Sequence, residues 1–151
     1  MATCKTCELV NRRDAGEAPI WDSIHRTRYF DVAHAFNTSL PGWIVLVARR
    51  HVAAIDELTM KEAAEVGLLI YAISKGLKAV VGCKKTYVMQ FAEQEGHDHV
   101  HFHIVPRMVN LPDADKSVNI LRHLGVGDRE CISAAEMTDV AMALRRHLGG
   151  C

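Results

Sequence analysis

Four histidines fall within seven residues of one segment, Gly96-His97-Asp98-His99-Val100-His101-Phe102-His103-Ile104-Val105-Pro106-Arg107. In an extended strand successive side chains point to opposite faces, so the four histidines would share one face and Val100, Phe102 and Ile104 the other. In a helix the same histidines would surround the axis and leave no apolar stripe. The segment therefore predicts a strand with one apolar face and a row of imidazoles on the other.

A row of imidazoles indicates chemistry, because histidine exists in neutral and charged forms near pH 7 and serves as nucleophile, acid, base or metal ligand. A solvated strand face and a histidine-rich metal tract are the alternatives. Solvated faces ordinarily carry Thr, Lys, Glu and Ser, so we interpret the row as a functional site.

The motif in this row resembles the signature of the histidine triad (HIT) superfamily of nucleotidyl hydrolases and transferases. That signature is His-φ-His-φ-His-φ-φ, where φ is apolar, and its histidines match His99, His101 and His103. Pro106-Arg107 also looks like the residues that follow the motif in many members. The resemblance covers about residues 4–107 and implies a small antiparallel sheet with a long helix between the central strands and the motif.

The rest of the chain predicts an α+β fold, with an antiparallel sheet of about five strands and no β-α-β alternation. Residues 1–20 look polar and irregular, and the region after residue 109 looks loop-rich up to Ser133. The capping boxes at Thr59 and Ser133 each begin a helix that ends at glycine. The expected strands lie within 24–36, 43–48, 86–91 and the histidine segment, and the expected helices span 59–81 and, in a C-terminal extension 108–151, 134–148.

The resemblance also assigns catalytic and phosphate-binding roles. His101, the central histidine, would attack the α-phosphorus of a nucleotide and form a covalent intermediate, with its ring oriented by a hydrogen bond to a backbone carbonyl. His103 and His97 would contact the phosphate, and His99 is a further catalytic candidate. Gly96 would let backbone amides approach the phosphate oxygens, unless it is an ordinary turn residue. Gln90 would place an amide near them, unless it is only a polar-face residue of its strand, and Gln94 is a weaker candidate.

The nucleoside contacts are less clear in the sequence. Where many HIT proteins hold the ribose with an acidic or amide side chain, this chain has Ala35. Phe36, Ile24 and Leu40 are candidates for a base pocket, although we favour ordinary core positions for each of them.

A metal site is indicated by Cys4-Lys5-Thr6-Cys7, which supplies two of the four ligands that a structural zinc needs. His51, after the strand at 43–48, and His99 are candidates for the other two. The same four-ligand arrangement occurs in a branch of the HIT superfamily that includes bacterial HIT proteins and galactose-1-phosphate uridylyltransferases, and it implies structural zinc. A zinc-bound His99 could not shuttle a proton, so His97 could replace it either as acid or as ligand.

Composition restricts the class of protein. The 151 residues are 49% hydrophobic and 24% charged, which suits one soluble domain, residues 1–151. The 18 basic and 18 acidic side chains balance, so charge predicts neither a nucleic acid nor a membrane as partner. No apolar run reaches the ~18–20 residues that span a bilayer, no signal peptide is evident, and the five scattered cysteines do not resemble a secreted disulfide framework. We expect a cytoplasmic protein.

These observations favour a nucleotidyl hydrolase or transferase acting on an adenosine 5′-phosphoryl compound, such as a dinucleoside polyphosphate or a phosphoramidate. A non-catalytic nucleotide-binding regulatory module and a metal-binding protein that uses the histidine row are the alternatives. By resemblance the chain would form a homodimer through 59–81 and 86–91. Leu68 and Ala72 lie off the apolar stripe of this helix, and such surplus apolar surface favours a partner. A helix packed between the sheet and the C-terminal helix would show the same pattern.

Overall fold

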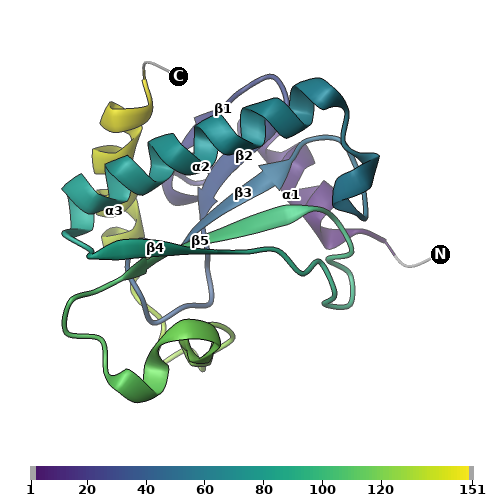
Figure 1. The fold of residues 1–151 in the computed structure, drawn as a ribbon. Helices are drawn as coiled ribbons and strands as arrows, with labels where there is room; N and C mark the ends of the chain where they lie inside the picture. The colour runs from purple at the N-terminus through teal and green to yellow at the C-terminus, as the bar shows by residue number, and fades with distance from the viewer. Residues whose placement is uncertain (1–2, 150–151) are drawn as a thin grey trace.

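One five-stranded antiparallel sheet organises the chain, in the order β1-β2-β3-β5-β4 (Figure 1). The computed structural model describes residues 3–149. The strands are β1 (His25–Arg26), β2 (Phe30–His34), β3 (Ile44–Ala48), β4 (Lys85–Met89) and β5 (His101–Arg107). The α-helices are α1 (Lys5–Asp14), α2 (Met60–Val81) and α3 (Ala134–Leu148), and the 3₁₀-helices are η1 (Ile20–Asp22), η2 (Ile55–Glu57), η3 (Asp113–Asp115) and η4 (Ser117–His123). The α+β fold, the long helix after the central strand and the C-terminal helix are as the sequence predicts.

The main core lies between one face of the sheet and the helices α2 and α3. Alternation in β5 sends Phe102 and Ile104 to this face, where they join a fully buried row from α2. Capping fixes the ends of α2: Thr59 and Glu62 satisfy each other's backbone N–H groups, and Gly82 ends the helix at φ +68°. The α2 side chains of the core are Leu69, Ile73 and Leu77.

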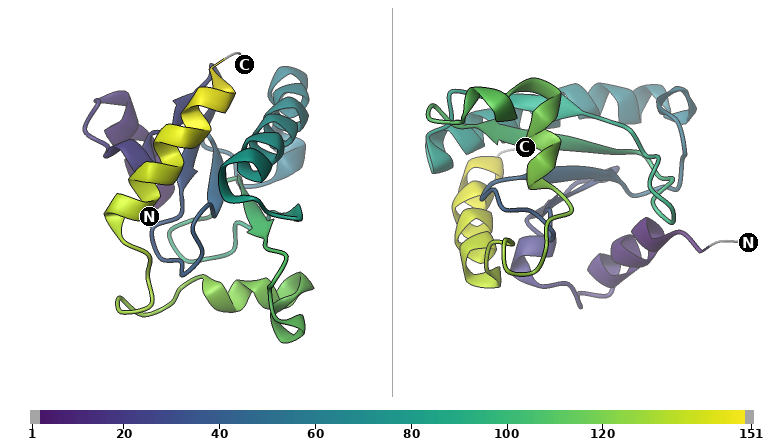
Figure 2. Two further views of the ribbon diagram at one scale, coloured as in Figure 1. Left: turned by 90° about the vertical axis from the view of Figure 1, so that its left-hand side faces the viewer. Right: turned by 90° about the horizontal axis from the view of Figure 1, so that it is seen from below.

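The opposite face of the sheet carries the odd-numbered residues of β5. There His101 pairs with Val47 and His103 with Val45. Helix α1 lies on this side, so α1 and α2 cover opposite faces (Figure 2). A second buried cluster, which includes Trp43, Val105 and Ile120, closes the same face near η4.

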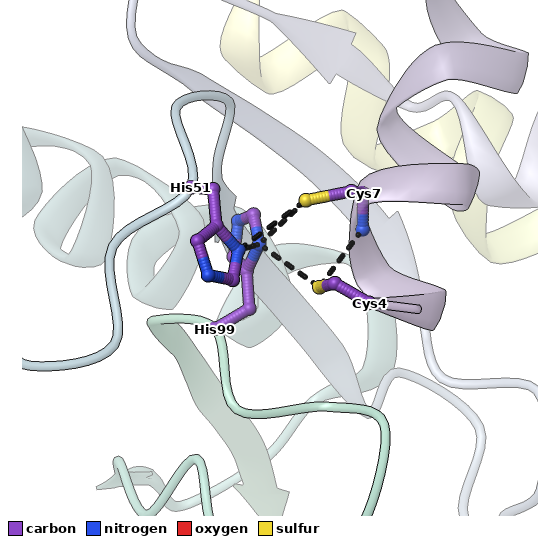
Figure 3. A group of neighbouring side chains, drawn as sticks. All are labelled: Cys4, Cys7, His51 and His99. Atoms are coloured by element: carbon purple, nitrogen blue, oxygen red, sulfur yellow. Dashed lines mark hydrogen bonds between the residues drawn. The ribbon is translucent and has the colours of Figure 1, made fainter. Parts of the chain in front are cut away.

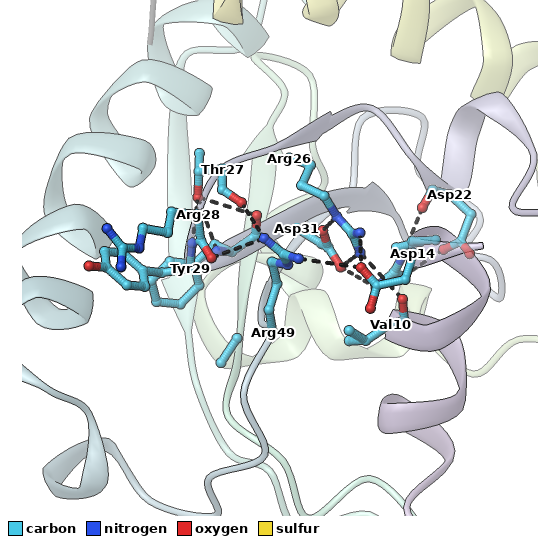
Figure 4. Close-up of polar contacts among 12 residues, drawn as sticks. Val10, Asp14, Asp22, Arg26, Thr27, Arg28, Tyr29, Asp31 and Arg49 are labelled. Carbon is cyan, nitrogen blue, oxygen red and sulfur yellow. Dashed lines mark hydrogen bonds and ion pairs between the residues drawn. The ribbon is translucent and has the colours of Figure 1, made fainter. Parts of the chain in front are cut away.

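Ion pairs attach α1 to the sheet (Figure 4). Arg13, whose side chain is 2% exposed, lies 2.7 Å from the Asp22 carboxylate and 3.6 Å from that of Asp31. Arg26 contacts Asp31 at 2.5 Å and also pairs with Asp14 at the end of α1. The charged side chains thus hold in place a helix that buries little apolar surface.

Two local predictions are wrong. Residues 5–14 form α1, because Cys4 caps the helix by accepting a hydrogen bond from the Cys7 N–H and the ion pairs replace the usual apolar stripe. The histidine strand begins at His101 rather than at 97: Gly96 adopts φ +80°, and the His97 N–H bonds back to the Gln94 carbonyl. The four histidines therefore do not share one strand face.

In the part of the chain that the structure describes, no helix combines the length and apolar character needed to cross a membrane.

Candidate functional site

His101 and His103 lie on the wall of a cavity of about 600 Å³ on the α1 side of the sheet. Val45 and Val47 of β3 form its apolar floor, directly beside the two histidines in the strand register. The other walls come from α1, from the loop after β4 and from residues near the β2–β3 turn and η4. Segments distant in sequence therefore surround two adjacent imidazoles.

The ring of His101 is oriented by the backbone. Its Nδ1 lies 2.8 Å from the His99 carbonyl oxygen, which can only accept, so Nδ1 carries the proton and donates it. Nε2 then keeps its lone pair. This is the hydrogen bond that the sequence interpretation expects of an attacking imidazole.

The ring of His103 is oriented by Trp43. The indole Nε1–H of the fully buried Trp43 donates to His103 Nδ1 at 3.0 Å, with the two rings nearly perpendicular. Because Nδ1 accepts, Nε2 carries the proton of the neutral ring. Burial, and then the proximity of His101, lowers the pKa of His103 to about 4. At neutral pH His103 therefore presents an uncharged N–H donor next to His101.

His99 points away from the cavity into a separate cluster with Cys4, Cys7 and His51 (Figure 3). Their donor atoms all lie within 4.8 Å of one another. His99 Nδ1 is 3.6 Å from Cys4 Sγ, 3.5 Å from Cys7 Sγ and 3.2 Å from His51 Nδ1, and Cys7 Sγ is 3.3 Å from His51 Nδ1. Tetrahedral zinc requires about 3.3 Å between two nitrogens and about 3.6 Å between nitrogen and sulfur, so these donors could hold such a metal ion.

The orientation of His99 strengthens that fit. Its Nε2 lies 2.6 Å from the Ala48 carbonyl oxygen, so Nε2 donates and Nδ1 offers a lone pair to the cluster. This is the usual outer support of a metal-bound histidine. Among the described residues, His97, His101 and His103 do not take part in the cluster.

His97 lines the cavity instead, with Nδ1 2.8 Å from the hydroxyl of Thr6. Burial, followed by the nearby His101 and Lys5, lowers the pKa of His97. Lys5 also lines the cavity and packs its aliphatic chain on Gly96, where an added Cβ would lie 3.0–3.2 Å from the Lys5 carbons. Glycine suits position 96 because of its φ of +80°, which L side chains rarely adopt, and the Lys5 chain packs closely against it.

Some of the other residues predicted to contact the nucleotide line the cavity, and others do not. Phe36, Ala35 and Gln94 are part of the lining, whereas Gln90 is not among the described residues that form it. Ile24 is buried in the main core and Leu40 packs on the second cluster, so the favoured core interpretation holds for both, whereas Phe36 lines the cavity. Apolar character alone does not distinguish a pocket wall from a core.

Sequence reasoning missed several residues of the lining. Lys5, Thr6, Leu9 and Arg13 come from α1, and Leu121, Leu124 and Gly125 come from the C-terminal segment. The only local signal was the placement of Lys5 and Thr6 between two candidate metal ligands. Trp43 was assigned to the central strand without its hydrogen bond to His103.

Comparison of the sequence with known protein families and with curated proteins found no match. Solved structures do match in fold. A hypothetical histidine triad nucleotide-binding protein from Sulfolobus tokodaii has a TM-score of 0.71 at 18% identity, over 97% of this chain and 93% of that one. A Zn-bound histidine triad family protein from Mycobacterium smegmatis has a TM-score of 0.65 at 18% identity, over 97% and 96%.

A third similar structure is the diadenosine triphosphate hydrolase of Plasmodium falciparum, with a TM-score of 0.62 at 18% identity over 84% of this chain and 76% of that one. Each of the three likenesses covers at least 84% of this chain. This chain has the histidine triad fold.

Proposed function

We propose that the protein is a nucleotidyl hydrolase or transferase of the HIT family, acting at the α-phosphate of an adenosine 5′-phosphoryl compound. One observation carries the proposal: the hydrogen bond from Nδ1 to the backbone leaves the lone pair of the neutral His101 ring on Nε2, at the wall of the cavity and next to the N–H donor of His103. The fold, which this chain shares with the similar structures, supports the proposal. The nucleoside would occupy the apolar part of the cavity, beside Phe36 and Val45.

The reaction has two displacements. The Nε2 lone pair of His101 attacks the α-phosphorus, a P–N bond forms, and the P–O or P–N bond to the leaving group breaks with its electron pair. The neutral ring approaches without adding negative charge, and the His103 N–H donates to a phosphate oxygen as charge develops there. Water then attacks phosphorus, the P–N bond to His101 breaks, its electron pair returns to Nε2, and the proton of the water passes to solvent. A different acceptor in place of water would give transfer.

Zinc is the metal that the cluster of Cys4, Cys7, His51 and His99 suits best, because two thiolates and two imidazoles form a closed tetrahedral donor set. We assign it a structural role: when bound, it ties the start of α1 to the loops before β5 and after β3. With all four positions filled by protein, no site is left for substrate or water. The M. smegmatis protein is described as Zn-bound, which supports this assignment.

A homodimer remains our proposal for self-association. Leu68 and Tyr71 on α2 are 71% and 64% exposed, and Val88 on the adjoining strand β4 is 44% exposed. Apolar side chains gathered on one helix and one strand favour a protein partner. Light scattering at micromolar concentration should give about twice the chain mass of 16.8 kDa, and a mass near that of one chain would refute the dimer.

The direct test of the activity is turnover of a panel of fluorogenic adenylates, adenosine phosphoramidates and dinucleoside polyphosphates. Wild-type protein should release AMP from at least one substrate, and His101→Ala should release none while still binding AMP. Nucleotide binding without turnover in the wild type would favour the regulatory-module alternative.

A further inference from the structure

The two residues between the metal-binding cysteines both reach the cavity. Lys5 and Thr6 belong to the first turn of α1, and both line the cavity. Thr6 is 4% exposed and contacts His97, while the Lys5 N–H donates to the Gly96 carbonyl at 2.8 Å and its chain packs on Gly96. The residues that follow Gly96 lead directly into β5. This turn therefore forms the wall of the cavity nearest the start of the histidine strand.

This wall differs in character from the rest of the lining. It offers the Lys5 ammonium, the imidazole of His97 and the amide of Gln94, whereas the floor and the region near η4 are apolar. The lining also contains two carboxylates. Asp22 is already paired with Arg13 at 2.7 Å, and Glu93 lies on the loop after β4. A nucleoside suits the apolar part, and an anionic group suits the wall at Lys5.

The position of His99 gives an independent argument about the leaving group. Its Nε2 donates to Ala48 and its Nδ1 faces the cysteines, so neither nitrogen is available to a group in the cavity. An amine leaving group departs well only if it is protonated. A phosphate chain already carries its negative charge near pH 7, because its last ionisation lies at about pH 6, and it can leave without a proton from His99.

We infer that Lys5, Thr6 and His97 form the leaving-group subsite of this protein, and that the subsite takes a phosphate chain. This inference rests on the proposed function, and within it the subsite favours substrates whose leaving group is a phosphate chain, namely dinucleoside polyphosphates and nucleoside diphosphates and triphosphates. The Lys5 ammonium supplies the positive charge that binds the phosphate oxygens. Thr6 holds His97 toward the same oxygens.

Binding measurements test the subsite without relying on turnover. The probes are AMP and adenosine 5′-(α,β-methylene)diphosphate, whose second phosphate would occupy the subsite but cannot be released. Isothermal titration calorimetry on zinc-loaded protein should show the diphosphate binding about tenfold more tightly, as expected for one charge-assisted contact. Lys5→Gln should remove this preference and leave AMP affinity within about twofold, and Lys5→Arg should restore it.

A matched control is Lys61→Gln, which removes the charge of an exposed lysine on the other side of the sheet and should keep the preference. Zinc content is measured for every variant, because Lys5 lies between two proposed ligands. Equal affinity of wild type for the two probes, or a preference that survives in Lys5→Gln, overturns the subsite. If AMP itself does not bind, or if His101→Ala retains turnover, the proposed function fails instead.

Discussion

His34 gives a quantitative prediction about stability and pH. Its ring is 1% exposed, Nδ1 donates to the Ala35 carbonyl at 2.7 Å, and Nε2 accepts from the Gly42 N–H at 2.9 Å. Both nitrogens are therefore used by the neutral ring, and protonation of Nε2 would set two N–H groups against each other. Burial lowers the pKa of His34 from 6.5 to about 4.

The direction of the pH effect on stability depends on whether the folded or the unfolded chain binds the proton more readily. Below pH 6.5 the unfolded chain takes up a proton at His34 while the folded chain does not, so the folded state loses relative stability as pH falls from 6.5 toward 4. With these two pKa values, the loss is about 2 kcal/mol at pH 5 and approaches about 3 kcal/mol near pH 4.

The assay is urea denaturation of wild type and His34→Gln at pH 7.5 and pH 5. The variant should be less stable at pH 7.5, because its side chain cannot reproduce both hydrogen bonds, but its stability should fall by about 2 kcal/mol less on acidification. Contributions from other histidines and the metal site occur in both proteins and cancel in the difference. The control is His147→Gln, at an exposed position, which should lose as much stability as wild type between pH 7.5 and pH 5. Parallel losses in wild type and His34→Gln would refute the reasoning.

Three further predictions address the site and its support. Trp43→Phe should cost about 1 kcal/mol of transition-state stabilisation and let the proton of His103 exchange between ring nitrogens, which ¹⁵N NMR detects; an unchanged Nε2–H tautomer would contradict the assignment. The double variant Cys4→Ser/Cys7→Ser should lose stoichiometric zinc by elemental analysis, whereas retained zinc would point to another metal site. Arg13→Met should lower unfolding free energy by about 3 kcal/mol, because Asp22 is left buried and unpaired; a loss below about 1 kcal/mol in urea denaturation would argue against a structural role for this ion pair.

The sequence predicted those features that depend on repeating patterns. Alternation in β5, the apolar run of β3 and the capping box of α2 each identify an element by local rules. The four members of the metal cluster were also predicted, from the Cys-x-x-Cys spacing, from His51 at the end of a strand and from the resemblance to zinc-containing HIT proteins, and the structure brings them together. Each of these signals lies within a few residues or belongs to a recognisable motif.

The features that the sequence did not predict depend on tertiary contacts. Helix α1 has a polar sequence and is held by Arg13 and its carboxylate partners, which lie up to 18 positions away in the chain. The bend before β5 depends on Gly96 at positive φ and on the packing of Lys5 against it. The contribution of Leu121 and Leu124 to the cavity requires η4 to fold back against the β2–β3 turn, where Thr38 bonds the His123 carbonyl at 2.8 Å.

The most direct test of the proposed function is to trap the covalent intermediate and locate it. Zinc-loaded protein is mixed with a slowly hydrolysed fluorogenic adenylate, quenched, digested and mapped by mass spectrometry. An adenylyl group on His101, absent from His101→Ala, is the predicted result. Modification of His97, His99 or His103 instead would contradict the assignment of His101 as the nucleophile.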